Sequence, residues 1–192
     1  IINWISGAKI RVGTKSINGK INPSHKYLNV KSDFNWENKH QAIRNLEVVN
    51  QIDCELDDEE IKNIGIVINE EDSREANSFI DKHFLDKSKN IVAVQPGAGQ
   101  VKNIWDVENF FFLLLRLYEK HKNYILITCG PTDKDVVKSL SEKLLKDNIG
   151  FVIESLPLKQ LCAVLKKTDL YITNDTGTMH IAASSDVKMI SL

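Results

Sequence analysis

From residue 90 onward, short and continuously apolar segments alternate with longer segments of helical periodicity, and this alternation strongly constrains the fold. The expected strands cover residues 91–94, 124–128, 151–153, 170–173 and 189–192. The expected helices between them cover residues 106–121, 133–147, 158–167 and 176–185. Apolar strands separated by helices of about three turns are typical of a parallel sheet that is covered on both faces. The sequence therefore predicts an α/β fold with a Rossmann-like parallel sheet.

The first part of the chain is irregular and polar. Turn signals stand at Asn18-Gly19 and Asn22-Pro23. One helix is expected over about 38–50, because its apolar residues fall on a single face. Residues 1–60 are therefore expected to be mainly irregular.

An acidic stretch at residues 53–60 indicates a solvated connection between two parts of the chain. After it, residues 64–68 predict a short strand and residues 73–84 an amphipathic helix. We therefore divide the chain into residues 1–60 and a Rossmann-like domain of residues 61–192.

Composition excludes several classes of protein. With 192 residues, 42% hydrophobic and 27% charged, the chain can build a sizeable core. A formal net charge of -1 gives no reason to expect a nucleic-acid partner. The three cysteines are widely separated, which favours reduced thiols in a cytoplasmic protein. No apolar run reaches the roughly 18 residues of a transmembrane helix.

Several common site motifs are absent from the sequence. Gly97-Ala-Gly99 lacks the third glycine of a dinucleotide fingerprint, and neither a Walker A motif nor a Gly-x-Ser-x-Gly elbow occurs. The five histidines show no metal-ligand spacing. The sequence therefore predicts no metal site and no nicotinamide cofactor.

Three polar loops follow predicted strands, at residues 95–103, 130–133 and 174–180. The carboxyl ends of parallel strands meet at one edge of a sheet, and ligands of such sheets bind beyond that edge. We therefore expect these loops to converge on one binding site.

The segment Asn174-Asp-Thr-Gly-Thr-Met-His180 places a strand-to-helix junction where an anion could bind. The first turn of a helix has unpaired N–H groups and a partial positive charge, and these groups would come from Thr176, Gly177 and Thr178. Asp175 could accept a hydrogen bond from a ribose or sugar hydroxyl, and His180 would face the same mouth. The alternative is a plain helix cap at Asp175 or Thr176, with His180 packing nearby.

The run Asn174-Asp-Thr-Gly-Thr-Met-His-Ile-Ala-Ala183 resembles the Asp-(Ser/Thr)-Gly-x-x-His-x-Ala-Ala signature of glycosyltransferase family 9, the ADP-heptose:lipopolysaccharide heptosyltransferases. Further stretches resemble the family in the same order, and together they span nearly the whole chain. These stretches are Ser6-Gly-Ala-Lys-Ile-Arg-Val-Gly13, His40-Gln-Ala-Ile-Arg-Asn-Leu46, Val94-Gln-Pro-Gly-Ala-Gly99, Asn103-Ile-Trp-Asp-Val-Glu-Asn-Phe110 and Ile125-Leu-Ile-Thr-Cys-Gly-Pro-Thr-Asp133.

The resemblance implies further donor-binding residues, although the sequence departs from the family pattern at some of them. In the first loop these are Gly99, Gln100, Lys102 and Asn103, where Asn103 stands at the family's usual lysine and Lys102 lies one place earlier. Lys102 could reach the phosphates, or it could be a solvated lysine beside a helix start.

Two more expected donor-binding residues lie in the loops that follow the next two strands. Asp133 would accept ribose hydroxyls, although the family's acid often stands at the position of Thr132; otherwise Asp133 caps the following helix. Leu156 matches the family's apolar residue under the adenine ring, but it could equally fill the core.

By resemblance, the chain is the donor-binding half of an inverting glycosyltransferase of the GT-B type that transfers heptose from ADP-heptose to the lipopolysaccharide inner core. Such enzymes usually need no metal or other cofactor. Their acceptor implies work at the inner face of the cytoplasmic membrane. Alternatives are a GT-B transferase that uses another nucleotide sugar, or a non-catalytic Rossmann-like binding module.

The chain starts at Ile1 and stops in an apolar segment, so we expect a fragment. The resemblance places most of the acceptor domain, the catalytic base and a C-terminal tail outside it. We therefore expect the 192-residue chain to bind nucleotide weakly and not to turn over.

Overall fold

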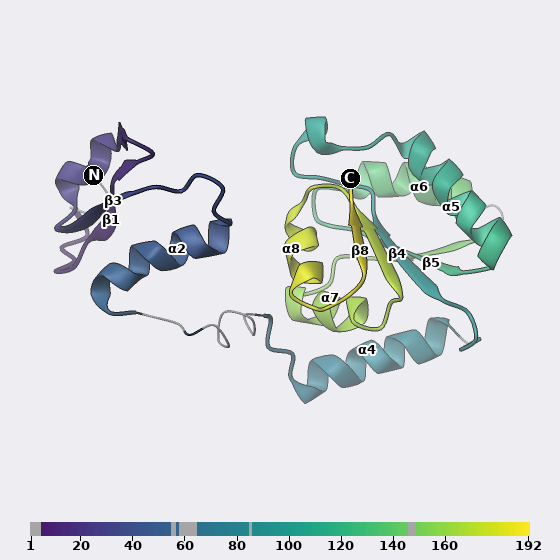
Figure 1. The fold of residues 1–192 in the computed structure, drawn as a ribbon. Helices are drawn as coiled ribbons and strands as arrows, with labels where there is room; N and C mark the ends of the chain where they lie inside the picture. The colour runs from purple at the N-terminus through teal and green to yellow at the C-terminus, as the bar shows by residue number, and fades with distance from the viewer. Residues whose placement is uncertain (1–4, 55–56, 58–64, 85, 146–148) are drawn as a thin grey trace. The chain divides into compact units, whose positions relative to one another are not determined.

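The computed structural model describes residues 5–54, 57, 65–84, 86–145 and 149–192. The chain divides into two compact units, Ile1–Ile64 and Gly65–Leu192 (Figure 1). Each unit is described by itself below.

The first unit contains a small three-stranded sheet in the order β2-β1-β3. Strand β1 (Val12–Ile17) pairs antiparallel with β2 (Lys20–Ile21) and parallel with β3 (Val30–Phe34). The predicted turn at Asn18-Gly19 is confirmed, because both residues have positive φ angles, 49° and 78°, and they join β1 to β2. Asn and Gly tolerate this left-handed backbone best, which is why the pair favours a tight hairpin.

The expectation of a mainly irregular first part was wrong. Strands β1 and β3 read VGTKSI and VKSDF, and only Ser16 among these residues is buried, so their sequence carries no apolar alternation. Backbone pairing and polar contacts between the strands, such as the bond from the Ser16 hydroxyl to Asp33 at 2.6 Å, hold this sheet, and hydrophobic periodicity does not predict them. A short 3-10 helix, Pro23–Tyr27, helix α2 (Gln41–Val49) and a further 3-10 turn, Asn50–Ile52, complete the regular elements described in this unit.

The second unit is an α/β domain with a five-stranded, fully parallel sheet in the order β6-β5-β4-β7-β8. This confirms the predicted fold class. The strands are β4 (Ile91–Gln95), β5 (Tyr124–Thr128), β6 (Gly150–Ile153), β7 (Leu170–Thr173) and β8 (Met189–Ser191). The helices are α4 (Glu70–His83), α5 (Val107–His121), α6 (Lys134–Leu145), α7 (Leu158–Leu165) and α8 (Gly177–Ala183).

Helices cover both faces of this sheet, and each face has its own core (Figure 1). Alternate strand residues point to opposite faces. Thus Ala93 and Leu126 pack with α4, α7 and α8, whereas Val94 and Ile127 pack with α5 and α6. Because both faces are buried, the strands have to be apolar throughout, which is the pattern that made them visible in the sequence.

Two predictions before β4 need correction. The strand expected over residues 64–68 is not formed: residues 65–68 have no regular structure, and Ile64 lies outside the described residues. Helix α4 starts at Glu70 rather than at residue 73, because Asn69 and Asp72 form a capping box. In it the Asn69 side chain accepts from the Asp72 N–H at 2.7 Å, and the Asp72 carboxylate accepts from the Asn69 N–H at 3.3 Å.

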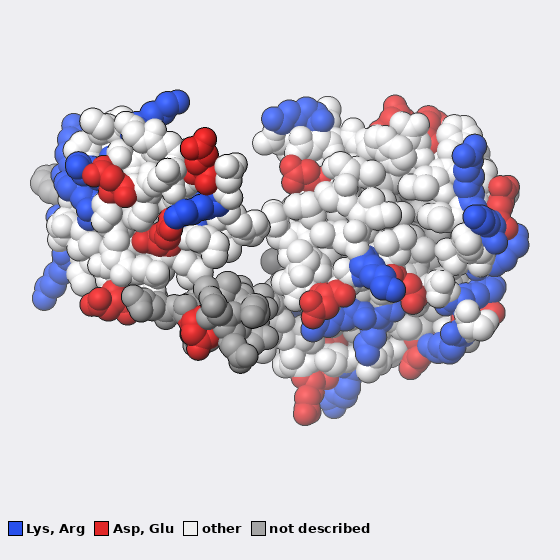
Figure 2. All heavy atoms as spheres, in the orientation of Figure 1, with Lys and Arg blue, Asp and Glu red and all other residues white. Residues whose placement is uncertain are grey.

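The surface charge of the second unit is mixed on the face that Figure 2 shows, where positive and negative side chains are interspersed. Local groups, rather than a broad field of one sign, therefore have to attract any charged ligand on this face. Among the described residues, no helix is long and apolar enough to span a membrane.

Replacing Leu114 in α5 tests the importance of the core between this helix and the sheet. Leu114 is 0% exposed, so we expect Leu114→Ala to lower the free energy of unfolding by about 2–5 kcal/mol. Phe112 on the same helix is 56% exposed, and Phe112→Ala should cost about 0.5 kcal/mol. Urea unfolding of both variants measures the difference, and equal losses would contradict the assigned burial of α5.

Candidate functional site

The carboxyl edge of the sheet contains a point where the strand order reverses. The chain builds outward from β4 through β5 to β6, and then returns to the other side of β4 for β7 and β8. Helix α5, which follows β4, packs on one face, and α8, which follows β7, packs on the other. The loops after β4 and β7 therefore diverge, and open α/β sheets bind ligands in the crevice that such loops form.

Asn174, the first residue after β7, joins these two loops. Its side chain is 0% exposed. The amide Nδ2 donates to the carbonyl of Pro96 at 2.7 Å and to that of Gly97 at 3.4 Å, while Oδ1 accepts from the Trp105 N–H at 3.1 Å. Sequence reasoning did not single out Asn174. An amide that directly follows an apolar and largely buried strand was the available signal.

Asp175 and Asn103 form a second link between the same two loops. The Asn103 Nδ2 donates to Asp175 Oδ2 at 3.2 Å. Asp175 is exposed and Asn103 is partly buried, so this bond lies at the mouth of the site. The structure thus brings together two residues that the sequence analysis placed in separate loops.

The first turn of α8 has no side-chain cap. Thr176 occupies the N-cap position with an extended backbone, but no side chain accepts a hydrogen bond from the turn. The alternative in which Asp175 or Thr176 caps this helix through its side chain is therefore not observed. The Met179 N–H donates to the Thr176 carbonyl at 3.0 Å, and the N–H groups of Gly177 and Thr178 stay open to another acceptor.

Thr178, in the first turn of α8, is hydrogen-bonded to Tyr171 of β7. The Tyr171 hydroxyl donates to Thr178 Oγ1 at 3.0 Å, and Tyr171 is 0% exposed. Burial raises the pKa of the Tyr171 phenol above its usual value, so the hydroxyl keeps its proton and remains a donor.

Asp133 lies inside the β5–α6 loop rather than at its surface. Its Oδ2 accepts from Gln95 Nε2 at 2.5 Å and from the Gly130 N–H at 3.2 Å, and its Oδ1 accepts from the Thr132 hydroxyl at 3.2 Å. Thr128 completes the group by donating to Gln95 Oε1 at 2.5 Å. Only 7% of Asp133 is exposed, and both carboxylate oxygens accept hydrogen bonds from groups within the protein.

Gly97 and Gly130 are glycines because Asp133 occupies the space beside them. A Cβ on Gly97 would overlap the Asp133 side chain, including the Cβ of Asp133. A Cβ on Gly130 would lie 2.6 Å from Asp133 Oδ2. Gly99 differs, because a Cβ there would meet nothing within 4 Å. The loops after β4 and β5 are therefore packed against each other through one carboxylate.

Two hollows adjoin these loops. The smaller, of about 70 Å³, is lined by residues from the ends of β4, β5 and β6 and from α8, among them Leu156 and Thr178. Leu156 also packs against the core on the α7 side, so both of its expected roles are compatible with its position.

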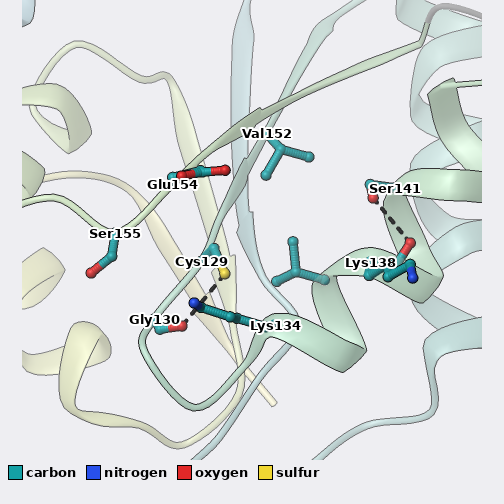
Figure 3. A pocket seen from close by; sticks show the side chains of 9 residues that line it. Cys129, Gly130, Lys134, Lys138, Ser141, Val152, Glu154 and Ser155 are labelled. Atoms are coloured by element: carbon teal, nitrogen blue, oxygen red, sulfur yellow. Dashed lines mark hydrogen bonds between the residues drawn. The ribbon is translucent and has the colours of Figure 1, made fainter.

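The larger hollow, of about 480 Å³, lies between α6 and the loop after β6 (Figure 3). Lys134 and Lys138 of α6 line one wall and Glu154 the other. Cys129 and Gly130 border both hollows. Burial, with a smaller contribution from the Asp133 charge, raises the pKa of the Cys129 thiol, and Lys134 opposes this in part.

The remaining expected site residues are open to solvent. Gly99, Gln100, Lys102 and His180 are exposed on the two loops and the start of α8, and Lys102 forms no ion pair with any described acidic side chain. Trp105 is partly buried and packs edge-on against Phe110, with 5.0 Å between the ring centroids, beside the core on the α5 and α6 side of the sheet. The described residues contain no group of three side chains that could hold a metal ion.

Gly97→Ala tests the packing of these loops on Asp133. The added methyl group must displace a buried, hydrogen-bonded carboxylate, so we expect a loss of about 1–3 kcal/mol in the free energy of unfolding. Gly99→Ala, in open space on the same loop, should change it by about 0.5 kcal/mol or less. Thermal or urea unfolding measures both, and similar losses would show that Asp133 does not restrict this loop.

Comparison with known proteins gives the family. The model of glycosyltransferase family 9 (heptosyltransferase) matches residues 1–192. The chain is 29% identical over 118 residues to the lipooligosaccharide heptosyltransferase 2 of Campylobacter jejuni, covering 59% of this chain and 36% of that protein. It is 26% identical over 106 residues to the lipopolysaccharide heptosyltransferase 3 of Escherichia coli, covering 54% and 31%.

Solved structures of the family share the fold. A family 9 glycosyltransferase from Veillonella parvula aligns with a TM-score of 0.74 at 19% identity, covering 99% of this chain and 52% of that one. The E. coli ADP-heptose lps heptosyltransferase II aligns with a TM-score of 0.73 at 14% identity, covering 97% and 56%. The chain thus spans about half the length of these structures and about a third of the curated relatives. Its match to the family model over its whole length shows that the chain belongs to glycosyltransferase family 9.

Proposed function

We propose that this chain forms the nucleotide-sugar site of a GT-B glycosyltransferase that transfers heptose from ADP-heptose to the inner core of lipopolysaccharide. Family membership supports glycosyl transfer, and the E. coli relatives are described as heptosyltransferases. The observation that carries the proposal is the junction between the β4–α5 and β7–α8 loops, which Asn174 joins beside a helix start without a side-chain cap.

The diphosphate is assigned to this junction of the two loops. The N–H groups at Thr176, Gly177 and Thr178 would donate to phosphate oxygens, and the partial positive charge of the helix start would favour them. The exposed loop of residues 99–103 would cover the phosphates from the other side, with Lys102 as the cation. Lys102 has no competing acidic partner among the described residues, so its ammonium group is available.

The nucleoside is assigned to the end of the sheet next to Leu156. The smaller hollow there has an apolar side formed by Ile153, Leu156 and Leu161, against which one face of a base would pack, and Thr178 at the proposed diphosphate site also lines it. Asp175, exposed and held by Asn103, would accept a ribose or sugar hydroxyl. We assign Asp133 to loop geometry instead of direct ribose contact, because its oxygens already have partners.

In the proposed reaction, the acceptor oxygen forms a bond to the anomeric carbon from the face opposite ADP, which inverts that centre. The bond between the anomeric carbon and the β-phosphate oxygen breaks, and ADP takes the electron pair. The residues of this chain stabilise the negative charge that grows on the β-phosphate, through helix N–H groups and Lys102. His180 would position a phosphate or sugar hydroxyl. We assign the base that takes the acceptor proton to no residue of this chain.

The proposal includes no metal and no further cofactor, because helix N–H groups and a lysine can carry the leaving-group charge. Its partners are the nucleotide-sugar donor and the lipopolysaccharide core acceptor, with no nucleic acid. Such an acceptor would place the protein in the cytoplasm, peripheral to the inner face of the cytoplasmic membrane.

Calorimetric titration with ADP, UDP and GDP tests the donor assignment. We expect saturable binding that favours ADP, and a loss of about tenfold in affinity in Asp175→Ala and in His180→Ala. Glu119→Ala provides the matched control, because Glu119 is an exposed acid in the last turn of α5 and lines neither hollow.

The outcomes separate the candidate functions. A preference for UDP or GDP would favour a transferase with another donor sugar nucleotide. No binding in a folded sample would contradict the proposed donor site and favour a non-catalytic module.

The reactivity of Cys129 offers an independent prediction. Thiolate is the nucleophile in alkylation, and the raised pKa of the Cys129 thiol lowers its thiolate fraction near pH 8. We therefore expect Cys129 to react more slowly with iodoacetamide in the folded chain than in the urea-unfolded chain, and more slowly still with saturating ADP, because Cys129 borders the proposed nucleoside pocket. Mass spectrometry of the alkylated peptides measures this, with exposed Cys54 as the internal control. An ADP effect of equal size at Cys54 would argue against local protection.

A further inference from the structure

Asn174 contacts both ends of the loop that is proposed to cover the donor diphosphate. Its two acceptors, the carbonyls of Pro96 and Gly97, lie where the chain leaves β4. Its donor, the Trp105 N–H, lies just before α5 begins at Val107. A single side chain thus fixes the start and the end of the segment that carries Lys102 and Asn103.

The chemistry of this contact requires an amide. One side of the buried space presents backbone carbonyls and the other a backbone N–H, so the side chain must both donate and accept. A hydrocarbon of the same size would satisfy neither, and buried backbone groups without partners are unfavourable. The hydrogen bond between Asn103 and Asp175 is more exposed, and solvent can replace either partner there. It therefore cannot take over the role of the Asn174 amide.

We propose that Asn174 is a positioning residue for the donor diphosphate: it sets the distance between the β4–α5 loop and the start of α8 without touching the ligand. The inference rests on the proposed function. Residues that hold binding groups within a fraction of an ångström of their productive geometry contribute to affinity and rate through those groups. Asn174 should therefore affect the recognition of phosphates much more than the recognition of the nucleoside, whose base is assigned to the hollow beside Leu156.

Asn174→Ala tests this through the ratio of two affinities. We measure ADP and adenosine binding by protein NMR titration, and expect the ADP-over-adenosine ratio to fall by about tenfold, with adenosine affinity changed by about twofold or less. Hydrogen exchange gives a second readout. The Trp105 amide should exchange about tenfold faster, while the amide of Ile172 in β7 stays protected.

Thr168→Val is the matched control, because it removes a buried hydrogen bond, from Thr168 Oγ1 to the Leu165 carbonyl, just before β7 at its opposite end. It should lower stability but leave the affinity ratio unchanged. If Asn174→Ala does not fold, Asn174→Ser, which keeps an acceptor for Trp105, is expected to show a smaller fall in the same ratio.

An unchanged ratio in a folded Asn174 variant would overturn the positioning role alone. If the wild-type chain binds neither ligand, or binds adenosine as tightly as ADP, the proposed diphosphate site itself fails. The two failures are therefore distinguishable.

Discussion

The arrangement of the site depends on two buried amides at the ends of neighbouring strands. Gln95 ends β4 and reaches the β5–α6 loop through Asp133, and Asn174 follows β7 and reaches the β4–α5 loop through Pro96 and Trp105. Both side chains are almost inaccessible to solvent, at 1% and 0%. Hydrogen bonds in such surroundings are costly to break, because the separated groups would have no water to pair with. Three loops that are far apart in sequence are thus held in one arrangement.

The buried Asp133 restricts the loops after β4 and β5 in two ways. A carboxylate in the protein interior needs several donors, and Asp133 has Gln95, the Gly130 N–H and Thr132. It also occupies the space where Gly97 and Gly130 would otherwise carry side chains. Steric exclusion and hydrogen bonding by Asp133 therefore both restrict the loops after β4 and β5. The exposed residues of these loops are not needed for this packing and remain free to contact a ligand.

The strands and helices of the second unit could be predicted because burial on both faces imposes an apolar sequence. Tyr124–Thr128 and Leu170–Thr173 coincide with their predicted ranges. The strands of the first unit could not be predicted in this way, since β1 and β3 are polar and mostly solvent-accessible. The Asn18-Gly19 turn and the helix expected over about 38–50, which the structure forms as α2 at Gln41–Val49, were predicted. The start of α4 was misplaced because its capping box, Asn69 with Asp72, was not recognised. Elements that depend on backbone pairing or on caps leave a weaker signal than elements that depend on burial.

The sequence by itself determined the parallel α/β class, the family signature at residues 174–183 and the candidates around the three loops. Local residue types and their spacing carry that information. Only the tertiary structure decided that Asp133 faces inward, that Asn174 joins the two loops, and that Lys102 and His180 stay exposed. These are properties of pairs of residues separated by up to 78 positions, as in the contact of Asn174 with Pro96. Strand order sets which of them meet, and a single sequence does not encode that order in its local pattern.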